Sequence, residues 1–381
     1  MVSELISQRD FCTEAGTARF AARHSHGKAA DAFNVAAQLT LSSLGIGTYL
    51  GASTDAADER YTAALVDAVR RGINVIDTAS NYRCQRSERA VGQALQTLFA
   101  SGEVFRSEIL VASKAGFVSF DGCPPSDVAS YMRKMTIDRG LCAELELSAG
   151  CHCIAPDFID ATLQTSLQNL NLSTIDVYFL HNPETQLQTL GKDDLDDRLR
   201  RAFERLELAA DRGQIRVYGI ATWSGLRAKP HERDHLSLER VLQCAHDVAG
   251  SRHRCRAVQL PMNLMMPEAF TLANQLVRGE MTTVLQAAQR LGLVVFGSGP
   301  LLQGKLAKRF PAHVPILHET FDAAATALQF ARSLPGVTST LVGMATMEHV
   351  VTNTALLSQP RAPQSWLTRA AQPDRQIGLV G

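Results

Sequence analysis

The chain has 381 residues, with 38 Lys and Arg against 38 Asp and Glu, so its formal net charge is zero. This balance argues against a general nucleic-acid binder, which needs a surplus of Lys and Arg to displace the counterions of phosphate. No apolar stretch reaches the roughly 18 residues of a membrane-spanning helix, and the first ten residues lack the pattern of a secretory signal. Eight cysteines are scattered from Cys12 to Cys255, which favours reduced thiols in a cytoplasmic protein.

Residues 1–38 are rich in Ala and show no clear hydrophobic period, so we expect an N-terminal extension that packs loosely on the body or is partly disordered. From residue 39 onward, short β-branched runs alternate with segments of helical periodicity. Near-continuous apolar strands between amphipathic helices indicate a parallel sheet that is covered on both faces. Eight strands are predicted, at residues 39–46, 73–76, 109–112, 175–180, 215–220, 257–260, 293–296 and 337–342.

Eight such units predict a closed (β/α)8 TIM barrel over residues 39–358, followed by a C-terminal tail at 359–381. An open doubly wound sheet is the alternative architecture. After the third strand, residues 116–156 contain no clear strand and only one short helix, near 127–134. Loops of this length inside a compact domain usually form lids or binding surfaces, so we expect this one to cover the mouth of the barrel.

A glycine-rich segment, Gly45-Ile-Gly-Thr-Tyr-Leu-Gly51, follows the first strand, and the second strand ends in an acid, Asp77. This context is similar to that of a dinucleotide-binding Rossmann turn. However, the third Gly comes one place late, because position 50 is Leu. The Rossmann interpretation also leaves the polar residues at the next strand ends without a role, so we do not favour it.

Those strand ends carry a set of residues suited to proton transfer. Asp77 ends the second strand, Tyr82 follows five residues later, Lys114 ends the third strand and His181 ends the fourth. In a barrel these ends converge. A nearby ammonium is expected to lower the pKa of the tyrosine, a carboxylate keeps the lysine charged, and a histidine orients a substrate oxygen. None of the four can deliver a hydride, so a redox cofactor is implied.

These residues resemble the signature of the aldo-keto reductases. The segments Gly72-Ile-Asn-Val-Ile-Asp-Thr-Ala-Ser-Asn-Tyr82 and Arg86-Ser-Glu-Arg-Ala-Val-Gly92 carry the resemblance, together with Lys114 and His181. Two extra residues before Ser87 and an Arg at position 83, where Gly is usual, are similar to the aldose dehydrogenase branch. The family implies a (β/α)8 barrel, an extended nicotinamide cofactor and reversible carbonyl reduction without a metal.

The resemblance also implies where the cofactor binds. Thr222 occupies the place of a Ser-Asn pair that usually holds the carboxamide, and Ser298 the place of a stacking aromatic. Gly343 and His349 stand where Lys and Arg are common, which favours NAD or dual use over NADP alone. The implied cofactor contacts are Gly47, Thr48, Tyr49, Asp77, Thr222, Gln259, Ser298, Gly299, Gly343, Thr346, His349 and Asn353.

Two further groups of residues are candidates for a role. Tyr49, Phe117, His152 and Trp223 are predicted to line the substrate pocket. A zinc ion would need ligands from Cys123, Cys142, Cys151, His152 and Cys153. The long loop contains no C-x-x-C pair, and the tripeptide Cys-His-Cys cannot easily present three ligands to one metal, so we expect no metal site.

The leading prediction is an NAD(P)-dependent oxidoreductase that interconverts an aldehyde or ketone with an alcohol. Tyr82 is the general acid and base, Lys114 modulates its pKa, Asp77 pairs with Lys114, and His181 is the orienting donor. The rival hypothesis is a barrel that binds the cofactor as a regulatory or structural subunit without useful turnover. In that case the complete set of proton-transfer residues would have no catalytic role. The oligomeric state is left open.

Overall fold

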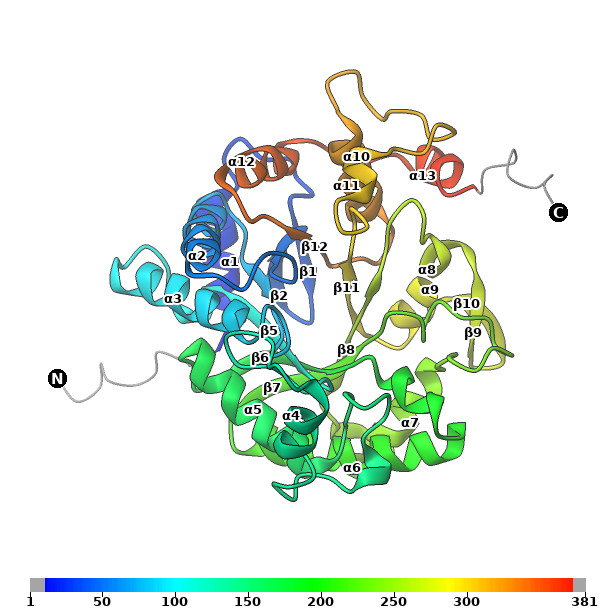
Figure 1. The fold of residues 1–381 in the computed structure, drawn as a ribbon. Helices are drawn as coiled ribbons and strands as arrows, with labels where there is room; N and C mark the ends of the chain where they lie inside the picture. The colour runs from blue at the N-terminus through cyan, green and yellow to red at the C-terminus, as the bar shows by residue number, and fades with distance from the viewer. Residues whose placement is uncertain (1–10, 373–381) are drawn as a thin grey trace.

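The computed structural model describes residues 11–372. Eight parallel strands close into a barrel, in which each strand pairs with the next one along the chain and β12 pairs with β3. Figure 1 shows the helices as a ring round these strands. The predicted (β/α)8 barrel is confirmed, and the open doubly wound sheet is wrong because the sheet closes on itself. The barrel strands are β3 (Leu44–Gly47), β4 (Val75–Asp77), β5 (Leu110–Ala115), β6 (Ile175–His181), β7 (Ile215–Ala221), β8 (Cys255–Pro261), β11 (Val294–Ser298) and β12 (Ser339–Gly343).

The connections between successive strands are helical. Gly213 and Gly292 end two of these helices with φ of 74° and 69°, a left-handed conformation that terminates a helix and leads into the next strand. The covering helices are α2 (Asp55–Arg70), α3 (Arg86–Ala100), α5 (Pro156–Leu170), α6 (Lys192–Asp211), α7 (Leu238–Ala249), α8 (Glu268–Thr271), α9 (Val284–Arg290), α10 (Lys305–Lys308), α11 (Ala323–Ser333) and α12 (Met347–Ala355). A hairpin of β9 (Ala273–Val277) and β10 (Glu280–Thr283) lies between α8 and α9.

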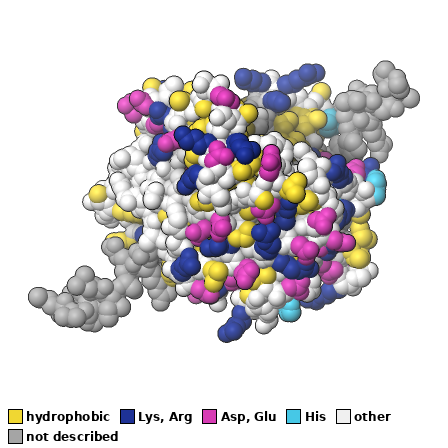
Figure 2. Space-filling model, turned by 60° about the horizontal axis from the view of Figure 1, so that its bottom comes forward, with side chains coloured by type: hydrophobic (Ala, Val, Ile, Leu, Met, Phe, Trp, Pro, Cys, Tyr) yellow, Lys and Arg dark blue, Asp and Glu magenta, His cyan; other side chains and the backbone are white. Residues whose placement is uncertain are grey.

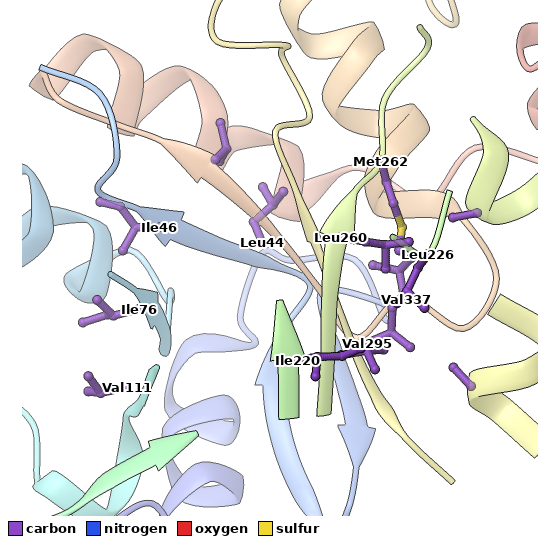
Figure 3. Close-up of a cluster of buried hydrophobic side chains, with 14 of the residues drawn as sticks. Leu44, Ile46, Ile76, Val111, Ile220, Leu226, Leu260, Met262, Val295 and Val337 are labelled. Carbon is purple, nitrogen blue, oxygen red and sulfur yellow. The ribbon is translucent and has the colours of Figure 1, made fainter. Parts of the chain in front are cut away.

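Apolar side chains fill both sides of the barrel wall. On the outer side, Ile46, Ile76 and Val111 occupy paired positions on β3, β4 and β5 and face the helices (Figure 3). A separate cluster fills the interior of the barrel. It contains Leu41, Val75, Leu110, Ala112, Val177, Phe179, Ala221, Ala257, Phe296 and Leu341. This double burial explains why the strands are apolar at nearly every position.

The interior also explains the glycine-rich segment that resembles a Rossmann turn. A Cβ at Gly45 would approach the Leu341 side chain to 2.8 Å and the Val75 side chain to 3.1 Å. Gly45 therefore makes room for neighbouring strands inside the barrel. Glycine is needed at position 45 because the strands pack closely there, and not because a phosphate group must approach the backbone as in a Rossmann turn.

The N-terminal extension is more ordered than the composition suggests. It forms α1 (Glu14–His24) and a hairpin of β1 (Phe33–Ala36) with β2 (Leu39–Ser42). The backbone N–H of Cys12 donates to the buried carboxylate of Asp176 at 2.7 Å, and Phe20 is fully buried. The extension thus packs firmly against the N-terminal end of the barrel, whereas residues 1–10 lie outside the described part.

The first predicted strand is in fact two strands. β2 ends at Ser42, and the barrel strand β3 begins at Leu44. The Ser42 hydroxyl donates to the Leu44 carbonyl at 2.7 Å, and the Ser42 N–H donates to the Asn74 side chain at 2.8 Å. These contacts turn the chain between the hairpin and the barrel, a break that the alternating sequence does not reveal.

The loop after β5 folds as a compact unit. Its stem is closed by backbone hydrogen bonds from Val118 N–H to the Cys151 carbonyl (2.9 Å) and from Cys153 N–H to the Gly116 carbonyl (2.7 Å). The loop contains α4 (Val128–Met135), where the sequence predicts a short helix, and an apolar cluster in which its side chains pack against the start of α5. This cluster is built round Val118, Met132, Cys153, Ala155 and Phe158. The loop is therefore held by apolar contacts as well as by its ends.

Charged side chains of both signs are interspersed on the face that Figure 2 shows. Ion pairs between helices produce part of this pattern, for example Arg200 with Asp247 at 2.8 Å and Arg205 with Asp157 at 2.8 Å. Among residues 11–372, no helix combines the length and the apolar character needed to cross a bilayer. The C-terminal segment forms α13 (Gln364–Ala370), in which Trp366 is buried.

Candidate functional site

The four polar residues predicted at the strand ends meet in one cluster. The Lys114 Nζ lies 2.8 and 2.7 Å from the two carboxylate oxygens of Asp77 and 3.2 Å from the Tyr82 hydroxyl oxygen. His181 ends β6, and its ring centroid lies 5.9 Å from that of Tyr82. The cluster forms because β4, β5 and β6 are adjacent parallel strands, whose carboxyl ends share one rim of the barrel.

Burial sets the protonation of this cluster. Lys114 and Asp77 are 1% and 4% exposed, so their ion pair is shielded from solvent. Burial lowers the pKa of Lys114, and the Asp77 carboxylate opposes this effect. Burial also lowers the pKa of His181 well below its usual range, and the charge of Lys114 adds to the effect. The imidazole of His181 is therefore neutral at pH 7 and has one N–H to donate.

Tyr82 departs from the expectation that the neighbouring ammonium lowers its pKa. The pKa is raised well above that of an ordinary tyrosine, first because the side chain is buried and second because of the Asp77 carboxylate. Lys114 does not reverse this shift, since Asp77 at 2.7 Å compensates its charge. The phenol consequently stays protonated at neutral pH, which is the form required of a proton donor.

The turn after Tyr82 has a strained backbone. Residues 83–85 have φ of 49°, 58° and 68°, although none of them is Gly. Such residues cost free energy and persist only where the surroundings hold them. The guanidinium of Arg83 donates twice to the Ala52 carbonyl, at 3.0 and 2.8 Å, and pairs with Asp58. These contacts fix the turn and therefore the position of Tyr82.

Three of the predicted substrate-lining residues are accessible aromatics near this cluster. Tyr49 is 52% exposed, and its ring lies 5.0 Å from the ring of Tyr82. The ring of Phe117 lies 5.1 Å from that of His181, edge to face. Trp223, 41% exposed, follows β7. The arrangement leaves an apolar surface beside the polar cluster.

His152, the fourth predicted substrate contact, lies in the interior and not on this accessible surface. It is fully buried, and its Nε2 lies 2.7 Å from the main-chain oxygen of His181. Its Nδ1 lies 2.8 Å from the side-chain nitrogen of Gln186. Burial lowers the pKa of His152 to about 4, so the ring is neutral. A direct contact with substrate does not fit this placement, because the stem of the loop turns His152 inward behind His181.

Several residues at the rim are suited to hold a nicotinamide. The Gln259 amide donates to Asp77 Oδ1 at 2.8 Å, which places the side chain beside the cluster. The Thr222 hydroxyl is buried and has no partner among the described residues, so a bound carboxamide would satisfy it. Thr48 differs, because its hydroxyl is buried and donates to the Asp77 main-chain oxygen at 3.2 Å.

Small residues lie at the rim, at the ends of β3, β11 and β12. Gly47 and Gly343 are paired strand ends, and a Cβ at either would meet no atom closer than 3.9 Å. Ser298 ends β11, and Gly299 beyond it has φ of 57° with no atom within 4 Å of a Cβ position. Small residues thus leave space where the extended cofactor is expected.

The predicted adenosine contacts lie on α12. The Thr346 hydroxyl caps this helix by accepting from the His349 N–H at 3.3 Å. His349 is exposed, whereas Asn353 is buried at 6%. The helix contains no Lys or Arg, and its exposed apolar residues are Met347 and Val351. Its first turn presents backbone N–H groups but no Lys or Arg side chain.

The cysteines of the long loop are free thiols in this structure, as are all eight in the chain. Cys153 is fully buried, whereas Cys123 is exposed. No three His, Cys, Asp or Glu residues in the described range are grouped so that they could hold a metal ion.

One residue that the sequence analysis missed is Glu184, two residues beyond Asn182. Its Oε1 accepts from the backbone N–H groups of Trp223, Ser224 and Gly225, at 2.7, 2.9 and 3.2 Å. This buried carboxylate shapes the turn that presents Trp223. The His-Asn-Pro-Glu run at the end of β6 is the signal that could have indicated it.

Comparisons with known proteins agree with this architecture. An aldo-keto reductase from Klebsiella pneumoniae, solved in complex with NADP and acetate, superposes with a TM-score of 0.57 at 20% identity and covers 89% of this chain and 94% of its own, which shows a shared fold. Aldo-keto reductase family 1 member C13 of Mus musculus is 24% identical over 208 residues, 52% of this chain and 49% of its own length.

The NADH-specific methylglyoxal reductase of Escherichia coli (strain K12) is 32% identical over 148 residues, 38% of this chain and 39% of its own length. The chain thus spans about half or less of the curated relatives that it matches. The model of the Aldo/keto reductase family matches residues 43–318, which include the whole set from Asp77 to His181. Together with the closed barrel and its strand-end cluster, this match shows that the chain belongs to the aldo-keto reductase family.

Proposed function

We propose that the protein reduces an aldehyde or a ketone to an alcohol, with Tyr82 as the general acid. The observation that carries the proposal is the 3.2 Å contact between Lys114 Nζ and the Tyr82 hydroxyl beside the buried Asp77 pair. When bound, the nicotinamide supplies the hydride. Tyr82 supplies the proton to the carbonyl oxygen, and in the reverse direction it takes the proton from the alcohol.

Each neighbour of Tyr82 has a distinct task. Lys114 holds the hydroxyl in place and stabilises the phenolate that remains after the proton has left. Asp77 fixes Lys114 through both of its oxygens. Neutral His181 donates a hydrogen bond to the substrate oxygen and aligns it with Tyr82. The aromatic residues Tyr49 and Trp223 exclude water from the carbonyl.

The residues that would hold the nicotinamide are Gln259 and Thr222, and Thr346 would mark the phosphate end. We propose that NADH is preferred over NADPH, since a 2′-phosphate is best held by Arg or Lys and α12 contains neither. The Escherichia coli relative is itself named an NADH-specific reductase. Fluorescence titration with both dinucleotides tests this preference, and NADPH binding at least tenfold tighter than NADH would overturn it.

Replacement of Tyr82 by Phe tests the central role. We expect kcat for carbonyl reduction to fall by about 10²–10⁴-fold, the usual contribution of a general acid, while the Kd for NADH stays the same. Tyr131→Phe is the matched control, because its hydroxyl donates to the Ser119 carbonyl at 3.0 Å inside the long loop. Turnover by Tyr82→Phe at the wild-type rate would refute the assignment. Tight NADH binding without any turnover of a panel of aldehydes by the wild type would favour the regulatory barrel.

A further inference from the structure

A chain of buried polar groups connects the long loop to His181. The Arg198 guanidinium contacts Gln186 Oε1, the Gln186 amide nitrogen lies 2.8 Å from His152 Nδ1, and His152 Nε2 lies 2.7 Å from the His181 main-chain oxygen. The Gln186 nitrogen also donates to the main-chain oxygen of His152 at 3.1 Å. These bonds join His181 of β6 to His152 in the loop stem. They also join His152 to Gln186, which lies between β6 and α6, and Gln186 to Arg198 of α6.

The chemistry of the groups fixes the direction of every bond in this chain. Arg198 can only donate, so Gln186 Oε1 accepts and the Gln186 amide nitrogen must donate. Nδ1 of His152 is then the acceptor, and the ring carries its proton on Nε2. That N–H donates to the carbonyl of His181. The tautomer of His152 is therefore set by Gln186 and Arg198.

The rings of His152 and His181 both pack against the ring of Phe117 in T-shaped contacts. The ring centroids of His152 and Phe117 are 4.9 Å apart, and those of Phe117 and His181 are 5.1 Å apart. Space here is tight, because a Cβ at Gly116 would lie 2.5 Å from the His181 carbonyl oxygen and 3.0 Å from His152 Nε2. The main chain and the ring of His181 are both supported by the same stem.

The loop supports Tyr82 as well. The Gln85 amide donates to the Phe120 carbonyl at 3.1 Å, and the Gly122 N–H donates to the Cys84 carbonyl at 2.9 Å. These bonds hold the strained turn that directly follows Tyr82. The loop between β5 and α5 therefore contacts the residues that hold both Tyr82 and His181, the two side chains that face the substrate carbonyl in the proposed reaction.

We propose that His152 is a positioning residue, which sets the main chain and ring of His181 through the Nε2–carbonyl bond and Phe117. This inference rests on the proposed function, in which His181 aligns the substrate oxygen. His152 is fully buried, so we expect it to act on turnover through the neighbours that it holds, His181 first.

The experiment is a double-mutant cycle with His152→Phe and His181→Ala, in which kcat and KM are measured with 4-nitrobenzaldehyde and NADH. His152→Phe keeps a ring of similar size but removes both hydrogen bonds. We expect kcat to fall at least tenfold with the Kd for NADH unchanged. In the His181→Ala background the same change should alter kcat by less than twofold, because residues that act through one another are not additive. His152→Gln, which retains a donor, should recover part of kcat.

His235→Phe is the matched control. Its Nε2 also lies 2.8 Å from a main-chain oxygen, that of Asn274, and the residue is 9% exposed, but its partners Asn274 and Gln275 belong to the β9 hairpin strand and not to the polar cluster. We expect this variant to lower Tm without changing kcat. If His152→Phe does not fold, Gln186→Met, which removes the amide that orients His152, replaces it with the same expectations.

Equal losses of kcat in both backgrounds, or a folded His152→Phe with wild-type kcat, would overturn the inference. The Tyr82→Phe variant is measured in the same assay. If it keeps wild-type turnover, the proposed function fails. If it loses turnover while His152→Phe and His181→Ala are additive, only the positioning role of His152 fails.

Discussion

Asp77 and Lys114 form an ion pair that solvent cannot reach, and Asp77→Asn tests what that pair contributes. The carboxylate accepts from Lys114 at 2.8 and 2.7 Å and from Gln259 at 2.8 Å. Asn preserves the shape but removes the negative charge and adds an N–H that points at other donors. Removal of one partner of a buried ion pair typically costs about 3–5 kcal/mol of stability.

The lysine itself sets an upper limit to this loss. A lysine with an ordinary pKa near 10.4 can be neutralised at pH 7 for about 4.6 kcal/mol, at about 1.36 kcal/mol per pKa unit. In Asp77→Asn the ammonium of Lys114 therefore loses its proton rather than stay buried without a partner at a greater cost. The expected loss at pH 7 is therefore about 3–4.6 kcal/mol, with the upper end set by neutralisation of Lys114.

The loss should depend on pH with a definite sign. Burial already lowers the pKa of Lys114 in the wild type, and removal of Asp77 lowers it further. The unfolded chain then binds one more proton than the folded variant. Its stability should increase by up to about 1.36 kcal/mol per pH unit as the pH rises toward the ordinary pKa of lysine. The difference between variant and wild type should therefore shrink between pH 7 and pH 9.

Urea unfolding followed by the fluorescence of the two tryptophans, Trp223 and Trp366, measures these free energies. The control is the double variant Asp77→Asn with Lys114→Met. It should be more stable than Asp77→Asn alone, because Met removes the free-energy cost of keeping a buried lysine deprotonated and without its partner. Additive losses in the double variant, or a loss that is constant from pH 7 to pH 9, would refute the reasoning.

Three further predictions concern other parts of the molecule. Since burial raises the pKa of Tyr82, kcat/KM for carbonyl reduction should stay constant from pH 6 to pH 9, and an apparent pKa near 8 in this profile would contradict the assignment. Glu108→Gln should cost about 1–3 kcal/mol in urea unfolding, because the buried carboxylate accepts from Arg19 and Arg23 of α1, each at 2.8 Å. Gly219→Ala should prevent folding, since its Cβ would lie 1.8 Å from the Ala257 carbonyl oxygen. In contrast, Gly213→Ala meets no atom within 4 Å and should cost only about 1–2 kcal/mol in the same assay.

The sequence by itself determined the barrel and the four residues of its polar cluster. Strands that are buried on both faces are apolar throughout, and this pattern repeats eight times in the chain. Parallel strands end at a common rim, so polar residues at the ends of β4, β5 and β6 must converge. Asp77, Lys114 and His181 were found for this reason, and Tyr82 by its spacing from Asp77 and by the resemblance to a family.

The tertiary structure alone decided the environment of these residues. His152 lies behind His181 because Gln186, 34 residues away, orients it, and no local pattern records that contact. The N-terminal extension is fixed by bonds such as that from Cys12 to Asp176, 164 residues apart. The pKa of Tyr82 is raised because the side chain is buried and lies near the charge of Asp77. The burial of a side chain and the charges around it depend on segments that are distant in the sequence. Both are therefore established only when the chain has folded.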